Sequence, residues 1–85
     1  MVEHDKSLFV AGQKQTAKAV RSGQAAEVFL AQDAAPRVVE GIRVLCEREG
    51  IALSTVATMK ELGKRCGIDT GAAAAARLKA QPDKA

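Results

Sequence analysis

The stretch at residues 12–23, GQKQTAKAVRSG, carries the residue types in this chain that are best placed to bind another molecule. It begins and ends with glycine, and glycines are common where helices start and stop, so a helix of about three turns is expected between them. Lys14, Lys18 and Arg21 recur at spacings of four and three residues, which places three cations along one side of that helix. No carboxylate occurs among residues 6–26, so nothing in the local sequence neutralises this row.

The first turn of this helix favours a negatively charged partner. Backbone N–H groups in a first helical turn have no partner within the helix, and the helix dipole places partial positive charge there. Gln13 and Gln15 add side chains that donate and accept hydrogen bonds. Together these groups suit a polyanion with hydrogen-bonding edges. The alternative is a short surface helix whose basic side is only solvated, which is the commoner case when composition alone is considered.

Length and charge are consistent with one small domain that has a basic face. The chain has 85 residues, so residues 1–85 are expected to form a single domain, with loose ends at 1–6 and 79–85. Its net charge is +3. Residues 1–50 carry seven basic and seven acidic side chains, whereas residues 51–85 carry six basic and three acidic ones. One basic face beside a balanced one fits nucleic-acid binding better than a uniform charge does.

The sequence gives no indication of a membrane segment, a metal site or a cofactor. It has no apolar run of membrane-spanning length and no signal-peptide pattern, so a cytoplasmic protein without membrane contact is expected. Cys46 and Cys66 are twenty residues apart, and His4 is the only histidine, so no zinc set can be assembled. Both cysteines fall within apolar helical patterns, which predicts buried free thiols.

An enzymatic function and a small-molecule substrate are not expected. The sequence contains no glycine-rich phosphate loop, no histidine placed for acid–base work and no paired carboxylates of an obvious pocket. Cys66 stands at the end of a predicted helix, where the dipole raises the pKa of a thiol and disfavours a nucleophilic thiolate. No large apolar stripe is left without a partner, so a monomer is expected.

Apolar patterning predicts alternating strands and helices. Strands are expected at 8–11, 27–32 and 51–57, and helices at 12–23, 36–50 and 58–66. The helix at 36–50 begins with proline, ends with glycine and carries apolar residues at spacings of three and four. On its outer side Arg43 and Glu47 are spaced to pair weakly. Such alternation implies a three-layer α/β/α sandwich around a mixed sheet of four strands.

The segment that starts at Thr58 has the Thr-x-x-Glu form of a capping box, which predicts a short helix ending before Gly67. Its apolar residues, Met59, Leu62 and Cys66, are expected to point inward. Lys60, Lys64 and Arg65 then face solvent or a partner. After the helix, the simplest expectation for Ile68 is a side chain that tucks back against the helix end.

Three segments taken together resemble the kink-turn-binding ribosomal protein family, of L-seven-Ae and L-thirty-e type, and in particular its short bacterial members of YbxF type. They are GQKQTAKAV at 12–20, SGQAAEVFLAQDAAP at 22–36 and MKELGKRCGIDTGAAAAA at 59–76. The likeness runs from residue 8 to residue 78 with the motifs in the family's order. Alanines at 72–76 favour a helix when read alone, but the resemblance implies that residues 72–78 form a central strand, with Arg77 where the strand emerges into water.

The resemblance also implies a partner and a set of contacts. Members of the family bind the kink-turn, an RNA duplex bent sharply by a bulge beside tandem sheared G·A pairs. Gly12 allows close backbone approach, Lys14 and Gln15 reach guanine edges, and the loop at 68–70 covers the extruded nucleotide. The full set of implied RNA-binding residues is Gly12, Gln13, Lys14, Gln15, Lys18, Arg21, Lys60, Lys64, Ile68, Asp69 and Thr70.

Two departures from the family pattern bear on this implied contact set. Archaeal members usually have Asn and Glu where this chain has Lys14 and Gln15, and valine is common where it has Thr70.

The physiological partner is expected to be a structured RNA, with a link to the ribosome. The remaining alternative is a protein-interaction or scaffold module of a ribonucleoprotein that has only non-specific affinity for RNA.

Overall fold

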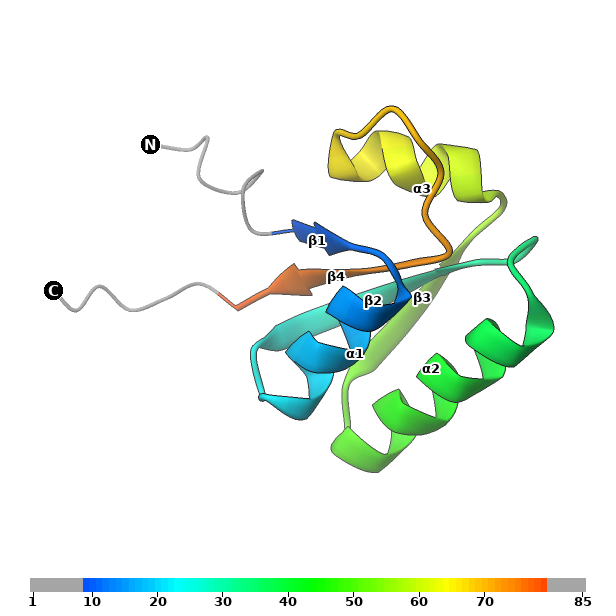
Figure 1. Ribbon diagram of the computed structural model, residues 1–85. Coiled ribbons are helices and arrows are strands. Elements are labelled where there is room, and N and C mark those ends of the chain that lie inside the picture. The colour runs from blue at the N-terminus through cyan, green and yellow to red at the C-terminus, as the bar shows by residue number, and fades with distance from the viewer. Residues whose placement is uncertain (1–8, 80–85) are drawn as a thin grey trace, which may run out of the picture.

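The computed structural model describes residues 9–79 and arranges them as a sheet between two layers of helices (Figure 1). Every helix and strand predicted within these residues is present in the predicted order, and boundaries differ by no more than two residues. Leu8 and the expected loose ends at 1–6 and 80–85 lie outside the described residues. The elements are β1 (Phe9–Ala11), α1 (Gln13–Arg21), β2 (Ala25–Ala31), α2 (Pro36–Glu49), β3 (Ala52–Val56), α3 (Met59–Cys66) and β4 (Ala74–Leu78).

The sheet is mixed, as predicted, and its strands pair in the order β1-β4-β2-β3. Strands β2 and β3 are parallel, whereas β4 runs antiparallel to both of its neighbours. Strands β1, β2 and β3 therefore end where β4 begins: Ala11 pairs with Ala75, and Leu30 pairs with Ala74. This topology brings the starts of α1, α2 and α3, together with the loop before β4, to one end of the sheet.

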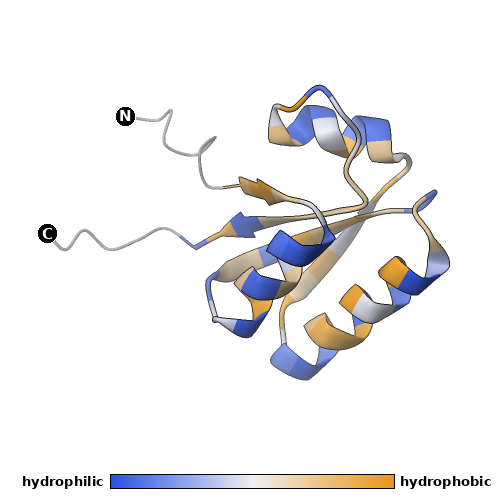
Figure 2. Cartoon of the chain, viewed as in Figure 1, coloured by the Kyte–Doolittle hydropathy of each residue, from blue (hydrophilic) through white to orange (hydrophobic). Residues whose placement is uncertain are grey.

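Helices α1 and α2 cover one face of the sheet, and α3 covers the other (Figure 1). Strand β2 contributes side chains to the cores on both sides of the sheet, because successive side chains point to opposite faces. Val28 and Leu30 pack in the core beneath α1 and α2, and Phe29 and Ala31 pack in the core beneath α3. The apolar sides of the helices face these two cores, and their hydrophilic residues lie outward (Figure 2).

The alanine run forms a central strand because its position in the sheet overrides its helix propensity. Strand β4 hydrogen-bonds on both sides, to β1 and to β2, and lies between α1 and α3. Ala74, Ala75 and Ala76 are each 0% exposed, so the strand gains burial and two ladders that an isolated helix lacks. Arg77 follows them, is exposed, and lies 3.4 Å from a carboxylate oxygen of Glu27, which confirms that the strand emerges into water there.

One prediction for an individual residue is wrong, and two further contacts add to what was predicted. Met59 was expected to point inward but is 36% exposed, because it occupies the first turn of α3 beside the loop that precedes β4. Arg43 lies 3.7 Å from Glu47, which confirms the expected pair, and it also lies 2.7 Å from Glu40, a partner that was not predicted. The backbone N–H of Lys79, the first residue of the expected loose end, donates to the carbonyl of Gln24 at 2.8 Å.

The start of α3 depends on the predicted threonine cap. The hydroxyl oxygen of Thr58 accepts a hydrogen bond from the backbone N–H of Glu61 at 3.0 Å. Within residues 9–79 the reciprocal bond from the Glu61 carboxylate is absent, so only the threonine half of the capping box is formed.

Replacing Thr58 with alanine is expected to lower the free energy of unfolding by about 1 kcal/mol, because a helix N–H loses its acceptor. Urea denaturation followed by circular dichroism measures the change. Thr58→Ser keeps the hydroxyl and is expected to stay close to the wild-type value. Equal stability of the alanine and serine variants would show that the cap contributes nothing.

Candidate nucleic-acid interface

The N-terminus of α1 is open to a partner. Gly12 precedes the helix with φ 109° and ψ 151°, a conformation that favours glycine, and no side chain caps the first turn. An added Cβ at Gly12 would meet nothing within 4 Å, so the backbone here borders open space. The first N–H groups of α1 are therefore available to a ligand that approaches this end of the sheet.

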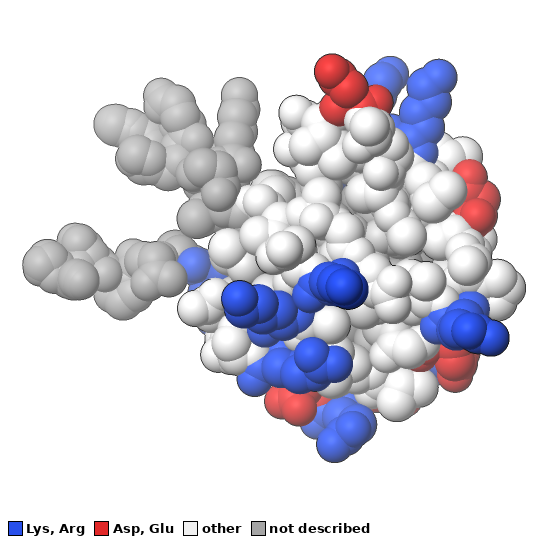
Figure 3. Space-filling model, in the orientation of Figure 1, with Lys and Arg blue, Asp and Glu red and all other residues white. Residues whose placement is uncertain are grey.

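The predicted basic row lies on the outer side of α1. Lys14, Lys18 and Arg21 are exposed, whereas Thr16 and Val20 are buried against the sheet. Basic side chains gather over α1, and this helix has no acidic residue in its first turn (Figure 3). The outer side of α1 therefore presents positive charge that no residue of α1 itself neutralises.

The polar and basic side chains of α1 lie on two flanks of the helix. Gln13, Lys14 and Arg21 line a groove toward α2, whereas Gln15 and Lys18 line a second hollow toward β1 and β4. A ligand seated over the start of α1 therefore meets amide and ammonium groups on both flanks of the helix.

The loop at residues 67–73 is held against α3 by its backbone. Gly67 ends the helix with φ 79°, and the N–H of Ile68 donates to the carbonyl of Gly63 at 3.0 Å. The N–H of Ala72 donates to the carbonyl of Met59, also at 3.0 Å. These bonds fix both sides of the loop tip, so its exposed residues have a defined position.

Ile68 does not tuck back against the end of α3. Its backbone N–H closes the helix, but its side chain is 38% exposed, so the simplest expectation for this residue is wrong. Asp69 and Thr70 are exposed as well. The loop thus presents an apolar side chain and two polar ones to solvent.

Topology brings this loop close to the start of α1. The N–H of Gly12 donates to the carbonyl of Ala74 at 2.8 Å, so the residue before α1 contacts the first residue of β4. The loop runs directly into that strand and passes beside the start of α1 (Figure 1). The two parts of the predicted interface, far apart in the sequence, therefore lie at the same end of the sheet.

Lys60 and Lys64 are not part of the row on α1. Both are exposed on α3, which covers the opposite face of the sheet, and they share a hollow with Thr58 and Glu61. They adjoin the predicted interface through the loop, since α3 leads directly into it. Any contribution they make is separate from that of α1.

Two contacts of α3 were not predicted from the sequence. Asp33, in the turn before α2, accepts a hydrogen bond from the backbone N–H of Met59 at 2.8 Å and so joins the starts of α2 and α3. The guanidinium of Arg65 lies 5.7 Å from the ring centre of Phe29. In the sequence, Asp33 is only a carboxylate within a loop, and Arg65 is only an arginine near the end of a helix. Neither position identifies the residue that it contacts.

Both cysteines are free thiols, and the fold buries them to different extents. Cys46 is buried and Cys66 is half-buried, and burial raises the pKa of each thiol. Among residues 9–79 there is no group of histidine, cysteine, aspartate or glutamate side chains that could hold a metal ion. Within the same residues no helix is long and apolar enough to cross a membrane.

Because thiolate is the reactive form and the thiol pKa values are raised, labelling with a maleimide or disulfide reagent is expected to be slower than for free cysteine at neutral pH. As the pH increases, the rate should continue to rise beyond the ordinary thiol pKa of about 8.5, where the rate for free cysteine levels off. Labelling in denaturant supplies the unhindered rate. Rapid reaction of native Cys66 at neutral pH would instead identify an activated thiol.

Comparison with known proteins agrees with this architecture. Residues 1–84 match the family described as ribosomal protein L7Ae/L30e/S12e/Gadd45. An RNA-binding protein of Caldanaerobacter subterraneus is 52% identical over 67 residues, which cover 79% of this chain and 82% of the relative. The RNA-binding protein YbxF of Geobacillus stearothermophilus is 40% identical over 70 residues, covering 82% and 85%.

A solved structure supports the same assignment. The Giardia lamblia 15.5kD RNA-binding protein superposes with a TM-score of 0.82 and 28% sequence identity, over 94% of this chain and 69% of that one. The resemblance seen in the three sequence motifs is thereby confirmed, as is the α/β fold. The chain is a member of the ribosomal protein L7Ae/L30e/S12e/Gadd45 family.

Proposed function

We propose that this protein binds structured RNA and that it recognises and stabilises the kink-turn, as part of a ribosome-related role. The proposal is supported by the hydrogen bond from Gly12 to Ala74, which joins the open N-terminus of α1 to the strand that directly follows the exposed loop at 68–70. The start of α1 offers cations and amides, and the loop offers an apolar side chain. A bent RNA with an extruded nucleotide has both a groove and a base for them to contact.

In this proposal the start of α1 enters the widened groove at the G·A pairs. Gly12 has no side chain to obstruct the approach of its backbone. Lys14 donates to the O6 and N7 atoms of guanine, and the Gln15 amide donates to or accepts from a base edge. Lys18 contacts a guanine edge or a phosphate, and Arg21 contacts the backbone. Gln13 adds a further amide beside the first turn.

The loop and α3 complete the contact. Ile68, which is exposed, covers the face of the extruded base, and Asp69 and Thr70 flank it with polar groups. Lys60 and Lys64 add attraction to phosphates from the other side of the loop, which raises affinity without selecting a sequence. Specificity therefore comes from α1 and the loop, and part of the affinity comes from α3.

The mechanism involves a shift of population. A kink-turn exchanges between an extended and a bent form, and a protein that contacts only the bent form shifts the equilibrium toward it by its differential affinity. No bond of the RNA is made or broken in this scheme.

Fluorescence energy transfer between dyes on the two arms of a kink-turn RNA tests the proposal. Saturating protein is expected to raise the transfer efficiency at low magnesium concentration, where the free RNA is largely extended. Binding without any change in transfer would contradict the proposal and favour a module with only non-specific RNA affinity. The two also differ in salt dependence, because binding to phosphates alone is lost steeply as salt is added.

A further inference from the structure

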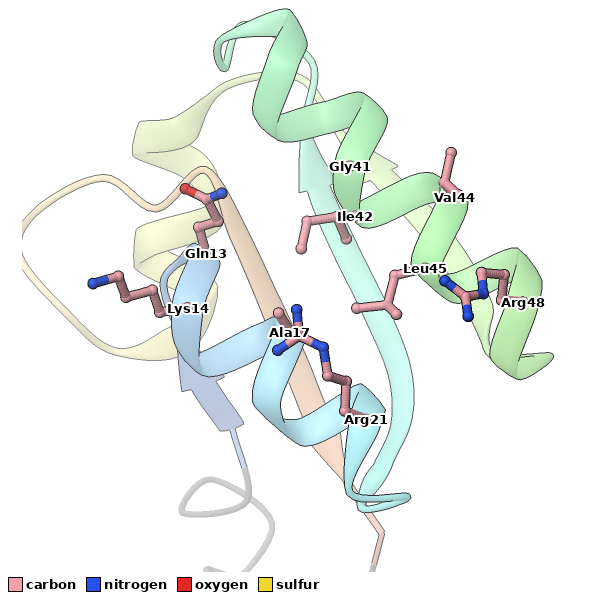
Figure 4. A pocket seen from close by; sticks show the side chains of 9 residues that line it. All are labelled: Gln13, Lys14, Ala17, Arg21, Gly41, Ile42, Val44, Leu45 and Arg48. Atoms are coloured by element: carbon pink, nitrogen blue, oxygen red, sulfur yellow. The ribbon is translucent and has the colours of Figure 1, made fainter.

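A groove between α1 and α2 continues away from the proposed base-reading end of α1. It encloses about 410 Å³, and the side chains of Arg21 and Arg48 reach over it from the two helices (Figure 4). Residues of both helices line it: Gln13, Lys14, Ala17 and Arg21 from α1, and Gly41, Ile42, Val44, Leu45 and Arg48 from α2.

We propose that this groove binds the phosphate backbone of the RNA arm that carries the G·A pairs, with Arg21 on one side and Arg48 on the other. This inference rests on the proposed function and extends it to a second contact surface. Nothing in the three sequence motifs points to Arg48, which lies in the last turn of α2.

The charges of the groove favour a polyanion. Three cations line it, Lys14, Arg21 and Arg48, and its lining includes no carboxylate. Within residues 9–79 neither Arg21 nor Arg48 forms an ion pair, although Arg43 and Arg77 both do. Two exposed guanidinium groups that no ion pair of the described residues engages are suited to bind phosphate oxygens.

The floor of the groove argues against an apolar peptide as the occupant. Ile42 is 3% exposed, and Ala17 and Leu45 pack against the core, so most of the apolar lining is already used within the protein. Val44, at 42%, is the exposed large apolar side chain of the lining. Gly41 adds no side chain, and an added Cβ there would meet nothing within 4 Å, so the groove stays open.

The groove is continuous with the base-reading surface. Lys14 belongs to both, and Arg21 lies seven residues further along α1, about 10 Å along the helix axis. A strand that leaves the G·A pairs and follows α1 therefore passes from Lys14 to the two arginines. An arm that ends directly after the G·A pairs does not reach them.

This difference in reach defines the experiment. Two kink-turn RNAs are compared, one with a long arm beyond the G·A pairs and one truncated directly after them, for wild type and Arg48→Gln. We expect the variant to bind the long-arm RNA about three- to tenfold more weakly and the truncated RNA as wild type does. The slope of log K against log salt should fall by about one for the long-arm RNA only.

Arg43→Gln is the matched control. It removes one positive charge from the same helix, but Arg43 is engaged by Glu40 at 2.7 Å, so no change is expected on either RNA. The groove assignment would be overturned if Arg43→Gln and Arg48→Gln lost equal affinity, or if Arg48→Gln lost equal affinity for both RNAs. Either result would mean that the effect comes from net charge alone. Unchanged binding of Arg48→Gln to the long-arm RNA would overturn it as well.

The outcomes also separate this inference from the proposed function. If wild type prefers a kink-turn to a straight duplex but Arg48→Gln behaves as wild type, only the groove assignment fails. A protein partner would then be the remaining candidate occupant of the groove. If wild type shows no such preference, the proposed function fails and the groove assignment fails with it.

Discussion

Replacing Lys18 or Gln15 with alanine is expected to weaken binding to kink-turn RNA by about 1–3 kcal/mol each, and binding to straight duplex RNA by much less. The magnitude is that of a side chain which reads a base edge. Both side chains are exposed on the flank of α1 that faces β1 and β4, and neither contributes to the core. Stability should therefore stay unchanged, so that the loss can be assigned to binding.

Fluorescence anisotropy with the two RNAs at one fixed salt concentration measures both affinities. Lys79→Ala provides a control, since it removes an exposed cation outside the proposed interface. Equal losses on kink-turn and straight duplex would mean that Lys18 acts only as a charge near phosphates. In that case the base-reading role would have to be withdrawn.

Two glycines within helices are expected to respond to alanine in opposite directions. Gly63, in α3, is buried, and a Cβ added there would clash with the carbonyl oxygen of Thr70 in the loop. Gly63→Ala should lower the free energy of unfolding by about 1–3 kcal/mol, because the loop must move away from the helix. Gly41, in α2, has nothing within 4 Å of the added atom. Gly41→Ala should raise stability by about 0.5–1 kcal/mol through helix propensity alone.

The same substitution at Gly63 tests the link between packing and binding. If the loop must rest against α3 to present Ile68, then Gly63→Ala should also weaken kink-turn binding at a temperature where the variant remains folded. Denaturant titration and anisotropy on one preparation give both quantities. A Gly63→Ala protein as stable as wild type would show that the loop does not pack against α3 as described.

The exposed row on α1 could be predicted from the sequence because helix geometry alone fixes it. Spacings of four and three residues place Lys14, Lys18 and Arg21 on one side whatever the rest of the fold does. The same holds for the buried residues of α2. Such local periodicities account for most of the secondary structure that was predicted correctly.

Features that depend on partners distant in sequence could not be derived in this way. The alanine run was assigned to a strand by resemblance, because its own propensity favours a helix and only its central place in the sheet reverses that. The contact of Gly12 with Ala74 follows from strand order, which no local pattern encodes. Arg48 was missed for the same reason, since its relation to Arg21 exists only once α1 and α2 pack side by side.

Met59 illustrates the limit of periodicity at the end of an element. Helical spacing groups it with Leu62, which is 0% exposed, but a first-turn residue can turn toward a neighbouring loop instead of the core. Ile68, after the last turn of the same helix, deviates in the same sense. Its backbone completes the helix end as expected, yet its side chain stays exposed at 38%. Both apolar side chains are thus exposed: Ile68 belongs to the proposed interface, and Met59 lies beside the loop that carries it.

The most direct test of kink-turn recognition is a titration of the protein into two labelled RNAs that differ only at the G·A pairs. One is a kink-turn, and in the other these pairs are converted to Watson–Crick pairs; magnesium and salt are held constant. Kink-turn recognition predicts tight binding to the first RNA and much weaker binding to the second. Equal, weak and strongly salt-dependent binding to both would contradict it, and would leave a basic α/β protein whose specific partner is a different molecule.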